Sequence, residues 1–164
     1  MELKFSKVRD VKTPTRGTSK SVGIDFYVPN DQPILSLRPH SDLLIPSGIR
    51  ANVLENFMLI AEDKSGVVTS KSACLRAGRQ PKPEAFDSPI IVGAKVVDED
   101  YQGEIYIHLI NCGDKVVTIY PGMKIAQFIL VPVSYAMPVE VPNEELFDSV
   151  SERGAGALGS TGSY

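Results

Sequence analysis

The stretch Glu104-Ile-Tyr-Ile-His-Leu-Ile110 places an apolar residue at every second position. This period of two is typical of a β-strand that is buried on one face. Shorter runs of similar composition lie on both sides of it, and turn sequences such as Tyr120-Pro-Gly122 separate them. Closely spaced strands with frequent turns predict an all-β fold, namely a sandwich, a jelly roll or a barrel.

The predicted secondary structure is almost entirely β. Strands are expected at residues 3–8, 23–28, 34–37, 42–45, 49–53, 57–61, 90–97, 104–111, 115–119, 125–133 and 137–141. The best candidate for a helix is residues 65–75. The expected organisation is one β domain at residues 1–146, with an inserted Pro-rich loop at about residues 76–88, and a flexible C-terminal arm at residues 147–164.

The composition argues against several classes of function. The 164 residues carry a net charge of −3, so no general basic field exists to hold a nucleic acid. The longest apolar run is far too short to span a membrane, and the first residues lack the apolar core of a secretory signal. The two cysteines form no CxxC pair, which argues against a zinc site. We expect a cytoplasmic protein, and a viral or nuclear setting stays open.

An acidic turn, Val96-Val-Asp-Glu-Asp-Tyr-Gln-Gly-Glu-Ile105, is the first candidate site. The plain interpretation is a hairpin with a solvated loop. The functional interpretation uses the carboxylates beside Tyr101, which would activate a water next to a bound sugar or base. A carboxylate close to a triphosphate also implies a divalent metal, because like charges would otherwise repel.

The C-terminal stretch Arg153-Gly-Ala-Gly-Ala-Leu-Gly-Ser-Thr-Gly162 is the second candidate. Glycines offer bare backbone N–H groups, and an arginine offers a planar fork of donors that suits phosphate. The plain interpretation is a frayed tail, because no strand leads into the segment and no helix follows it.

Together, these motifs resemble those of the trimeric dUTP pyrophosphatases (dUTPases). Asp98-x-x-Tyr101-x-Gly103 resembles the third motif of the family, and the tail resembles the fifth. The other three motifs follow in family order: Gly23-Ile-Asp25 is similar to AGxDL, Lys64-Ser65-Gly66 to PRSG, and Pro121-Gly-Met-Lys-Ile-Ala-Gln127 to GDRIAQ.

The resemblance implies a jelly-roll-like β domain that assembles as a homotrimer with shared active sites. The implied reaction is dUTP + H₂O → dUMP + diphosphate with Mg²⁺, which removes dUTP and supplies dUMP for thymidylate synthesis. The implied catalytic residue is Asp98, which would activate the water that attacks the α-phosphate. Asp25 would help to hold Mg²⁺ through water.

The resemblance also implies which residues bind the substrate. Backbone groups around Lys95, Val96 and Val97 would read the uracil edge, and Tyr101 would pack against deoxyribose. The phosphates would contact Lys64, Ser65, Gly66 and Gln127. The arm would close over the site with Arg153, Leu158, Gly159, Ser160 and Thr161.

Several positions depart from the family pattern. Lys64 and Lys124 replace arginines, and lysine offers a point charge instead of a bidentate fork. Leu158 replaces a phenylalanine that stacks on the base. Lys95 replaces a glycine, so backbone strain is expected if that position needs a positive φ.

Two alternatives remain beside the active dUTPase. One is a dCTP deaminase or a bifunctional relative, since these share the fold and a similar fourth motif. The other is a protein-binding regulator, with a protein partner bound through the loop at residues 76–88.

Overall fold

The computed structural model describes residues 1–80 and 86–156. The chain divides into two compact units, residues 1–134 and residues 135–164. This division lies N-terminal to the expected boundary at residues 146 and 147. We describe each unit by itself.

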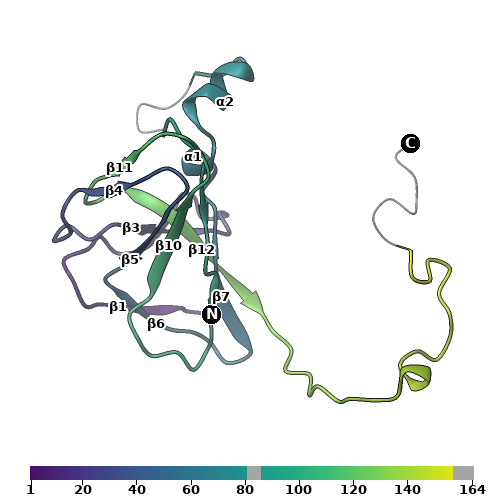
Figure 1. The fold of residues 1–164 in the computed structure, drawn as a ribbon. Coiled ribbons are helices and arrows are strands. Elements are labelled where there is room, and N and C mark those ends of the chain that lie inside the picture. The colour runs from purple at the N-terminus through teal and green to yellow at the C-terminus, as the bar shows by residue number, and fades with distance from the viewer. Residues whose placement is uncertain (81–85, 157–164) are drawn as a thin grey trace. The chain divides into compact units, whose positions relative to one another are not determined.

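The first unit is built from strands. These are β1 (Lys4–Lys7), β2 (Thr15–Arg16), β3 (Ile24–Tyr27), β4 (Leu35–Leu37), β5 (Asp42–Pro46), β6 (Ile49–Asn52), β7 (Phe57–Glu62), β8 (Ile90–Val92), β9 (Val96–Val97), β10 (Tyr106–Asn111), β11 (Val117–Ile119) and β12 (Lys124–Pro132). Two short helices, α1 (Ser65–Val68) and α2 (Lys71–Arg76), lie at one end of the strands (Figure 1).

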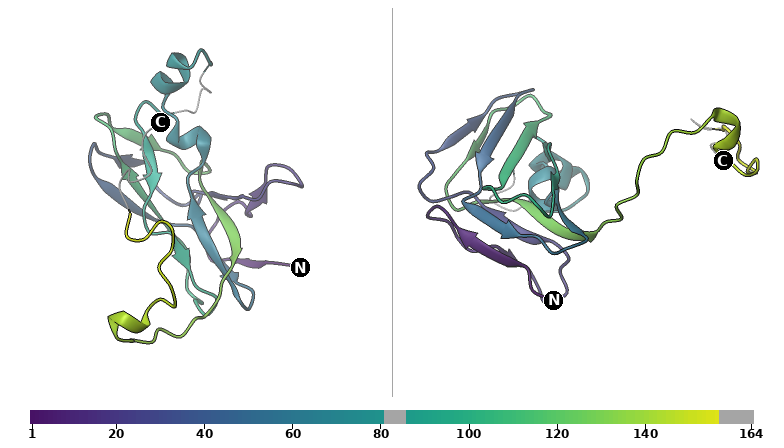
Figure 2. Two further views of the ribbon diagram at one scale, coloured as in Figure 1. Left: turned by 90° about the vertical axis from the view of Figure 1, so that its right-hand side faces the viewer. Right: turned by 90° about the horizontal axis from the view of Figure 1, so that it is seen from below.

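Two larger sheets carry the candidate sites. One sheet has the strand order β2-β3-β12-β7-β9, and the other has the order β5-β10-β8. Two-stranded sheets β1-β6 and β11-β4 complete the unit. All the pairings are antiparallel, and Figure 2 shows strands on both sides of the interior. The expected all-β, jelly-roll-like fold is confirmed.

The core is aliphatic with a small aromatic centre. Phe26 and Phe128 are fully buried, and their ring centroids lie 4.2 Å apart. Around them lie the inward residues of both large sheets, such as Leu59, Ile107 and Leu109. The alternation in residues 104–110 thus reports the buried face of β10.

Two predicted elements were wrong in detail. The strand predicted at residues 90–97 is split, because β8 pairs with β10 whereas β9 pairs with β7. The helix predicted at residues 65–75 is broken at Ser70, which has extended backbone angles and caps α2 by accepting a hydrogen bond from the Ala73 N–H. In addition, the pattern did not predict the two-residue strand β2.

Residues 137–141 form no strand. Met137 is 84% exposed and Val139 72% exposed, and no strand among residues 1–80 and 86–156 pairs with the segment. Pro138 and Pro142 also lack the N–H groups that a ladder requires. In the described part of the second unit, the regular element is a 3-10 helix, η1 (Asn143–Glu145).

The end of the predicted inserted loop is anchored to the core. Phe86 is buried, and its carbonyl accepts a hydrogen bond from the Lys71 N–H. Ser88 is also buried and donates from Oγ to Oδ1 of Asn111. Residues 81–85 lie outside the described residues. Within the part of the chain that the structure describes, no helix is long and apolar enough to cross a membrane.

Candidate active site

A cavity of about 210 Å³ lies between the segment at residues 94–98 and strands β5 and β10. It brings together five of the residues that the sequence singled out, and it adds residues that the sequence did not. Its lining consists of Leu44, Ala94, Lys95, Val96, Val97, Asp98, Tyr101, Ile105, Tyr106 and Phe128.

One wall of the cavity is the edge strand β9. The carbonyl of Lys95 accepts a hydrogen bond from the Ala61 N–H at 2.7 Å, so Lys95 directs its backbone polar groups toward β7. Because these groups alternate in direction along a strand, the N–H and C=O of Val96 point away from the sheet. The edge therefore offers one donor and one acceptor side by side.

Lys95 fits this edge without strain. Among the described non-glycine residues, only His40 and Asn56 have a positive φ, so the strain expected at Lys95 is absent. Its ammonium lies 3.3 Å from an oxygen of Glu62, on the neighbouring strand. The long side chain is thus held on β7.

The carboxylates of the acidic turn have different environments. Glu99 Oε2 accepts a hydrogen bond from the Asn56 N–H at 2.5 Å, which ties the turn to the start of β7. Asp98 lines the cavity, and its carboxylate has no hydrogen-bond or ion-pair partner among the described residues. Asp100 is exposed and does not line the cavity. Asp98 is therefore the carboxylate that is free to act on a bound molecule.

The Tyr-x-Gly spacing has a local physical reason. Tyr101 donates from Oη to the carbonyl of Glu104 at 2.8 Å, so the ring folds back over the hairpin. A Cβ on Gly103 would lie 2.5 Å from that hydroxyl oxygen. Only a glycine at position 103 leaves enough space for the Tyr101 ring to lie there. The hairpin base is fixed by Glu104, whose carboxylate accepts from Arg9 Nε and from the Gly48 N–H, both at 2.8 Å.

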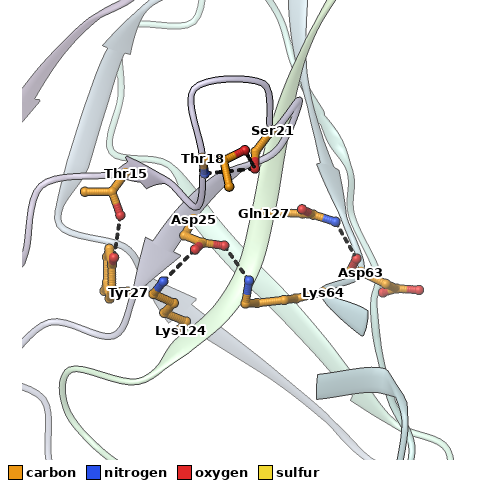
Figure 3. A network of polar contacts seen from close by, with 9 residues as sticks. All are labelled: Thr15, Thr18, Ser21, Asp25, Tyr27, Asp63, Lys64, Lys124 and Gln127. Carbon is orange, nitrogen blue, oxygen red and sulfur yellow. Dashed lines mark hydrogen bonds and ion pairs between the residues drawn. The ribbon is translucent and has the colours of Figure 1, made fainter. Parts of the chain in front are cut away.

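A second polar cluster joins the first, second and fourth motifs (Figure 3). Asp25 on β3 is only 3% exposed, and its two carboxylate oxygens accept from Lys64 Nζ at 2.7 Å and from Lys124 Nζ at 2.8 Å. Burial alone would raise the pKa of Asp25. The hydrogen bonds from Lys124 and Lys64 outweigh that effect and hold the pKa below its ordinary value.

Gln127 extends this cluster to the turn after β7. Its Nε2 donates to the carbonyl of Asp63 at 2.8 Å, while Asp63 accepts from the Val92 N–H at 2.6 Å. A Cβ on Gly23 would lie 2.0 Å from Oε1 of Gln127, so glycine is needed there to leave room for the amide. The glycine of the first motif and the glutamine of the fourth are thus one packing unit.

The cavity and the polar cluster lie on opposite faces of one sheet. Gln127 is the register partner of Asp25, so their side chains share a face. Phe128, the next residue along β12, points to the other face and lines the cavity. A continuous hydrogen-bonded sheet therefore separates the cavity from the polar cluster within one chain.

A model of the dUTPase family matches residues 9–162. The chain belongs to the dUTPase family. It is 32% identical over 163 residues to the deoxyuridine 5'-triphosphate nucleotidohydrolase of Hydrogenobaculum sp. (strain Y04AAS1), a match that covers 99% of both chains. The relative from Chlamydia pneumoniae is 34% identical over 149 residues, covering 91% of this chain and 90% of the relative.

Solved dUTPase structures share the fold. The Staphylococcus bacteriophage 80alpha dUTPase, determined with dUPNHPP, superposes with a TM-score of 0.75 at 18% identity. The match covers 98% of both chains. At this identity the likeness concerns the fold alone.

Two further residues of the dUTPase motifs, Ser65 and Gly66, do not line the cavity. Ser65 and Gly66 are exposed at the start of α1. Arg153 belongs to the second unit, where its Nε donates to the carbonyl of Gly156 at 3.0 Å. Leu158, Gly159, Ser160 and Thr161 lie outside the described residues.

Asp25 does not fit the expected role in holding Mg²⁺ through water. Both of its oxygens accept from lysine ammoniums, and its side chain is almost fully covered. Among the described residues, no group of three or more His, Cys, Asp or Glu side chains is placed to hold a metal ion. The cluster carries a net positive charge, since two lysines surround one carboxylate.

We expect Asp25→Asn to lower the free energy of unfolding by about 2 kcal/mol at pH 7, because two lysines then lose their counter-charge. The figure lies below that for fully buried pairs, since both lysine ends reach solvent. The folded pKa is depressed, so this stabilisation is complete above about pH 5 and is lost as the pH falls through the native pKa.

Urea unfolding of the parent protein and of Asp25→Asn at several pH values measures this effect. The difference between them should shrink toward acid pH. Asp31→Asn is the matched control, since Asp31 is a half-exposed partner of Arg9 at 4.0 Å. A difference that does not change with pH would contradict the ion-pair explanation.

Five residues that line the cavity were not identified from the sequence, namely Leu44, Ala94, Ile105, Tyr106 and Phe128. Leu44 and Tyr106 are exposed and apolar, and they come from the paired strands β5 and β10. Exposed apolar residues at the outward positions of a strand are the only signal that the sequence carries for them.

Proposed function

We propose that the protein hydrolyses dUTP to dUMP and diphosphate, which removes dUTP and supplies dUMP for thymidylate synthesis. The observation that carries the proposal is the unpartnered carboxylate of Asp98, among the described residues, in a cavity beside the polar edge of Val96. Asp98 accepts a proton from the attacking water and aligns it with the α-phosphorus. The leaving group is diphosphate.

The open edge at Val96 suits uracil. Uracil offers an N–H donor at N3 next to a carbonyl acceptor at O4. The Val96 carbonyl accepts from the first, and the Val96 N–H donates to the second. Cytosine reverses both roles, with an acceptor at N3 and an amino donor at C4, so two hydrogen bonds would be lost. A site built for hydrogen bonds rejects such a mismatch strongly, because the bound base covers the polar groups of Val96 and leaves them unpaired.

Tyr101 provides the sugar filter. Its ring, held over Gly103, packs against deoxyribose and leaves no room for a 2′-hydroxyl. We expect Gly103→Ala to displace the ring and to lower kcat/KM for dUTP about tenfold, while UTP is affected less.

Steady-state hydrolysis of dUTP and UTP measures this change. Gly17→Ala is the matched control, since the nearest atom to a Cβ there is Ser21 Oγ at an ordinary 3.5 Å. An unchanged ratio of dUTP to UTP hydrolysis in Gly103→Ala would remove Tyr101 as the sugar filter.

The triphosphate binds at the cationic cluster and the turn beside it. Lys64, Gln127 and the exposed start of α1 at Ser65 and Gly66 contact the phosphates. The arm then closes, with Arg153, Gly159, Ser160 and Thr161 on the γ-phosphate and Leu158 over the base. Mg²⁺ would be bound mainly by the triphosphate itself, because its negative oxygens are the ligands that this ion prefers.

We propose that the active sites are shared between the subunits of a homotrimer. The cavity and the cationic cluster lie on opposite faces of one sheet, whose strands are hydrogen-bonded and leave no passage. One substrate therefore cannot occupy both half-sites of a single chain. A neighbouring chain supplies the second half-site.

Mixed oligomers test the shared site. Asp98→Asn disables the cavity, and Lys64→Ala with Gln127→Ala disables the cationic cluster. Refolding the two inactive variants together should restore activity, because some sites then combine two intact halves. Mixtures no more active than their parents would contradict a shared site.

The reaction itself is tested by diphosphate release from dUTP, dTTP, dCTP and UTP, with Mg²⁺ and then with EDTA. Selective, Mg²⁺-dependent release from dUTP supports the proposal. Ammonia release from dCTP would instead favour the deaminase alternative.

The two cysteines are free thiols, which suits a reducing cytoplasm.

A protein partner at the inserted loop stays a prediction. Leu75 on α2 is 58% exposed next to this loop and offers an apolar contact. Deletion of residues 78–85 tests it, since Phe86 and Ser88 are buried and must be kept. Lost capture of a partner with full dUTP turnover would establish a second function.

A further inference from the structure

His108 joins the two walls of the cavity. The cavity is lined by Ala94 on one side and by Leu44 on the other. His108 lies on β10, and its Nδ1 accepts a hydrogen bond from the Ala94 N–H at 3.1 Å. Its other ring nitrogen, Nε2, lies 2.9 Å from Oδ2 of Asp42, two residues before Leu44 on β5. The imidazole thus bridges the chain segments that form both walls.

The partners fix the tautomer of the ring. A backbone N–H can only donate, so Nδ1 must present its lone pair to Ala94. The proton is therefore on Nε2, which donates to the carboxylate of Asp42. Each nitrogen has a distinct task, and the 24% exposed side chain has little freedom to exchange them.

The backbone also packs tightly against the ring. A Cβ on Gly93 would lie 2.2 Å from Nδ1 of His108, so only glycine allows this approach. The Gly93 N–H donates to the carbonyl of His108 at 2.9 Å. Here the chain leaves β8 in one sheet and enters β9 in the other. The position of Val96, two residues after Ala94, depends on this crossing.

We infer that His108 is a positioning residue for base recognition, which rests on the proposed dUTP hydrolysis. It acts through Ala94, which sets where the polar edge of Val96 meets the base. Asp42 holds the ring in the orientation and tautomer that the Ala94 N–H requires. His108 touches no substrate in this scheme.

Two conservative substitutions separate the two hydrogen bonds. In His108→Asn, the amide oxygen can take the place of Nδ1 and keep the bond to Ala94. In His108→Gln, the amide nitrogen can take the place of Nε2 and keep the bond to Asp42, but the bond to Ala94 is lost. His108→Leu removes both. His40→Asn is the control, because His40 pairs with Asp114 at 3.0 Å in an exposed position that does not line the cavity.

The main readout is the ratio of kcat/KM for dUTP to that for dCTP. We expect the ratio to fall about five- to tenfold in His108→Gln and His108→Leu, mainly through a higher KM for dUTP, since one aligned hydrogen bond is misplaced. His108→Asn should keep most of the ratio, and His40→Asn should keep all of it. The same ratio in all four variants as in the parent protein would overturn the inference, even if the melting temperatures differ.

A second measurement, by NMR, tests the inference without enzymatic turnover. The ¹⁵N shifts of the His108 ring should show the Nε2–H tautomer, and the Ala94 amide should be protected from hydrogen exchange in the parent and in His108→Asn only. Protection that survives in His108→Leu would overturn the inference. Failure of the proposed function appears separately, as a parent protein that does not hydrolyse dUTP.

Discussion

Asp98→Asn is expected to lower kcat for dUTP about 10³-fold while leaving KM and the unfolding temperature nearly unchanged. A positioned general base contributes about 10²- to 10⁴-fold, and asparagine has nearly the same shape but cannot take a proton. The carboxylate of Asp98 has no protein partner among the described residues, so its loss breaks no structural contact there. Single-turnover kinetics with dUTP measures the chemical step directly.

The acidic turn supplies a matched control. Asp100→Asn removes the same charge two residues away, at an exposed position that does not line the cavity. It should keep nearly full turnover. If Asp100→Asn and Asp98→Asn lost the same activity, the turn would act through its net charge, and Asp98 would not be the base.

Truncation after Ser151 is expected to lower kcat/KM for dUTP by about 10²- to 10³-fold, the range seen when one donor to developing charge is removed. The truncation removes Arg153 and the glycine-rich residues that follow it. Arginine contacts to phosphate strengthen when a lid excludes water, so the loss should fall on the chemical step as well as on binding. Steady-state kinetics and a thermal melt measure the two consequences.

The melt should change little, because the buried hydrophobic residues that the structure describes lie between Val11 and Phe128. Truncation after Gly162 is the control, since it keeps the whole motif and removes only Ser163 and Tyr164. Full activity of the chain that ends at Ser151 would show that no arm closes over the site. A large loss of stability would show that the arm has a structural role.

Local patterns were sufficient for the β fold and for the family. Alternation in residues 104–110 predicted β10 because one face of that strand is buried. The five motifs kept their family order along the chain. The Tyr101-x-Gly103 spacing is also readable from sequence, since the ring lies against a glycine two residues away.

The tertiary structure decided which partner each polar group has. Glu99 and Asp98 are neighbours, yet only the register of the turn against Asn56 gives Glu99 a backbone partner. Asp25 meets lysines 39 and 99 residues away, and these two ion pairs were not expected from the sequence. Such pairings depend on which strands lie side by side, and a local pattern does not encode this.

The dependence on partners from distant parts of the chain also explains the other differences between the predicted and the observed structure. Residues 137–141 have strand-like composition but no partner strand within the described residues, and a strand exists only as part of a ladder. His108 is an ordinary outward position in the alternation, and its role follows from Gly93 crossing above it. Patterns in the sequence were enough to identify most of the strands, the family and the chemical groups available. Only the folded sheets determined which of those groups face a cavity, which face each other, and which face of the sheet each occupies.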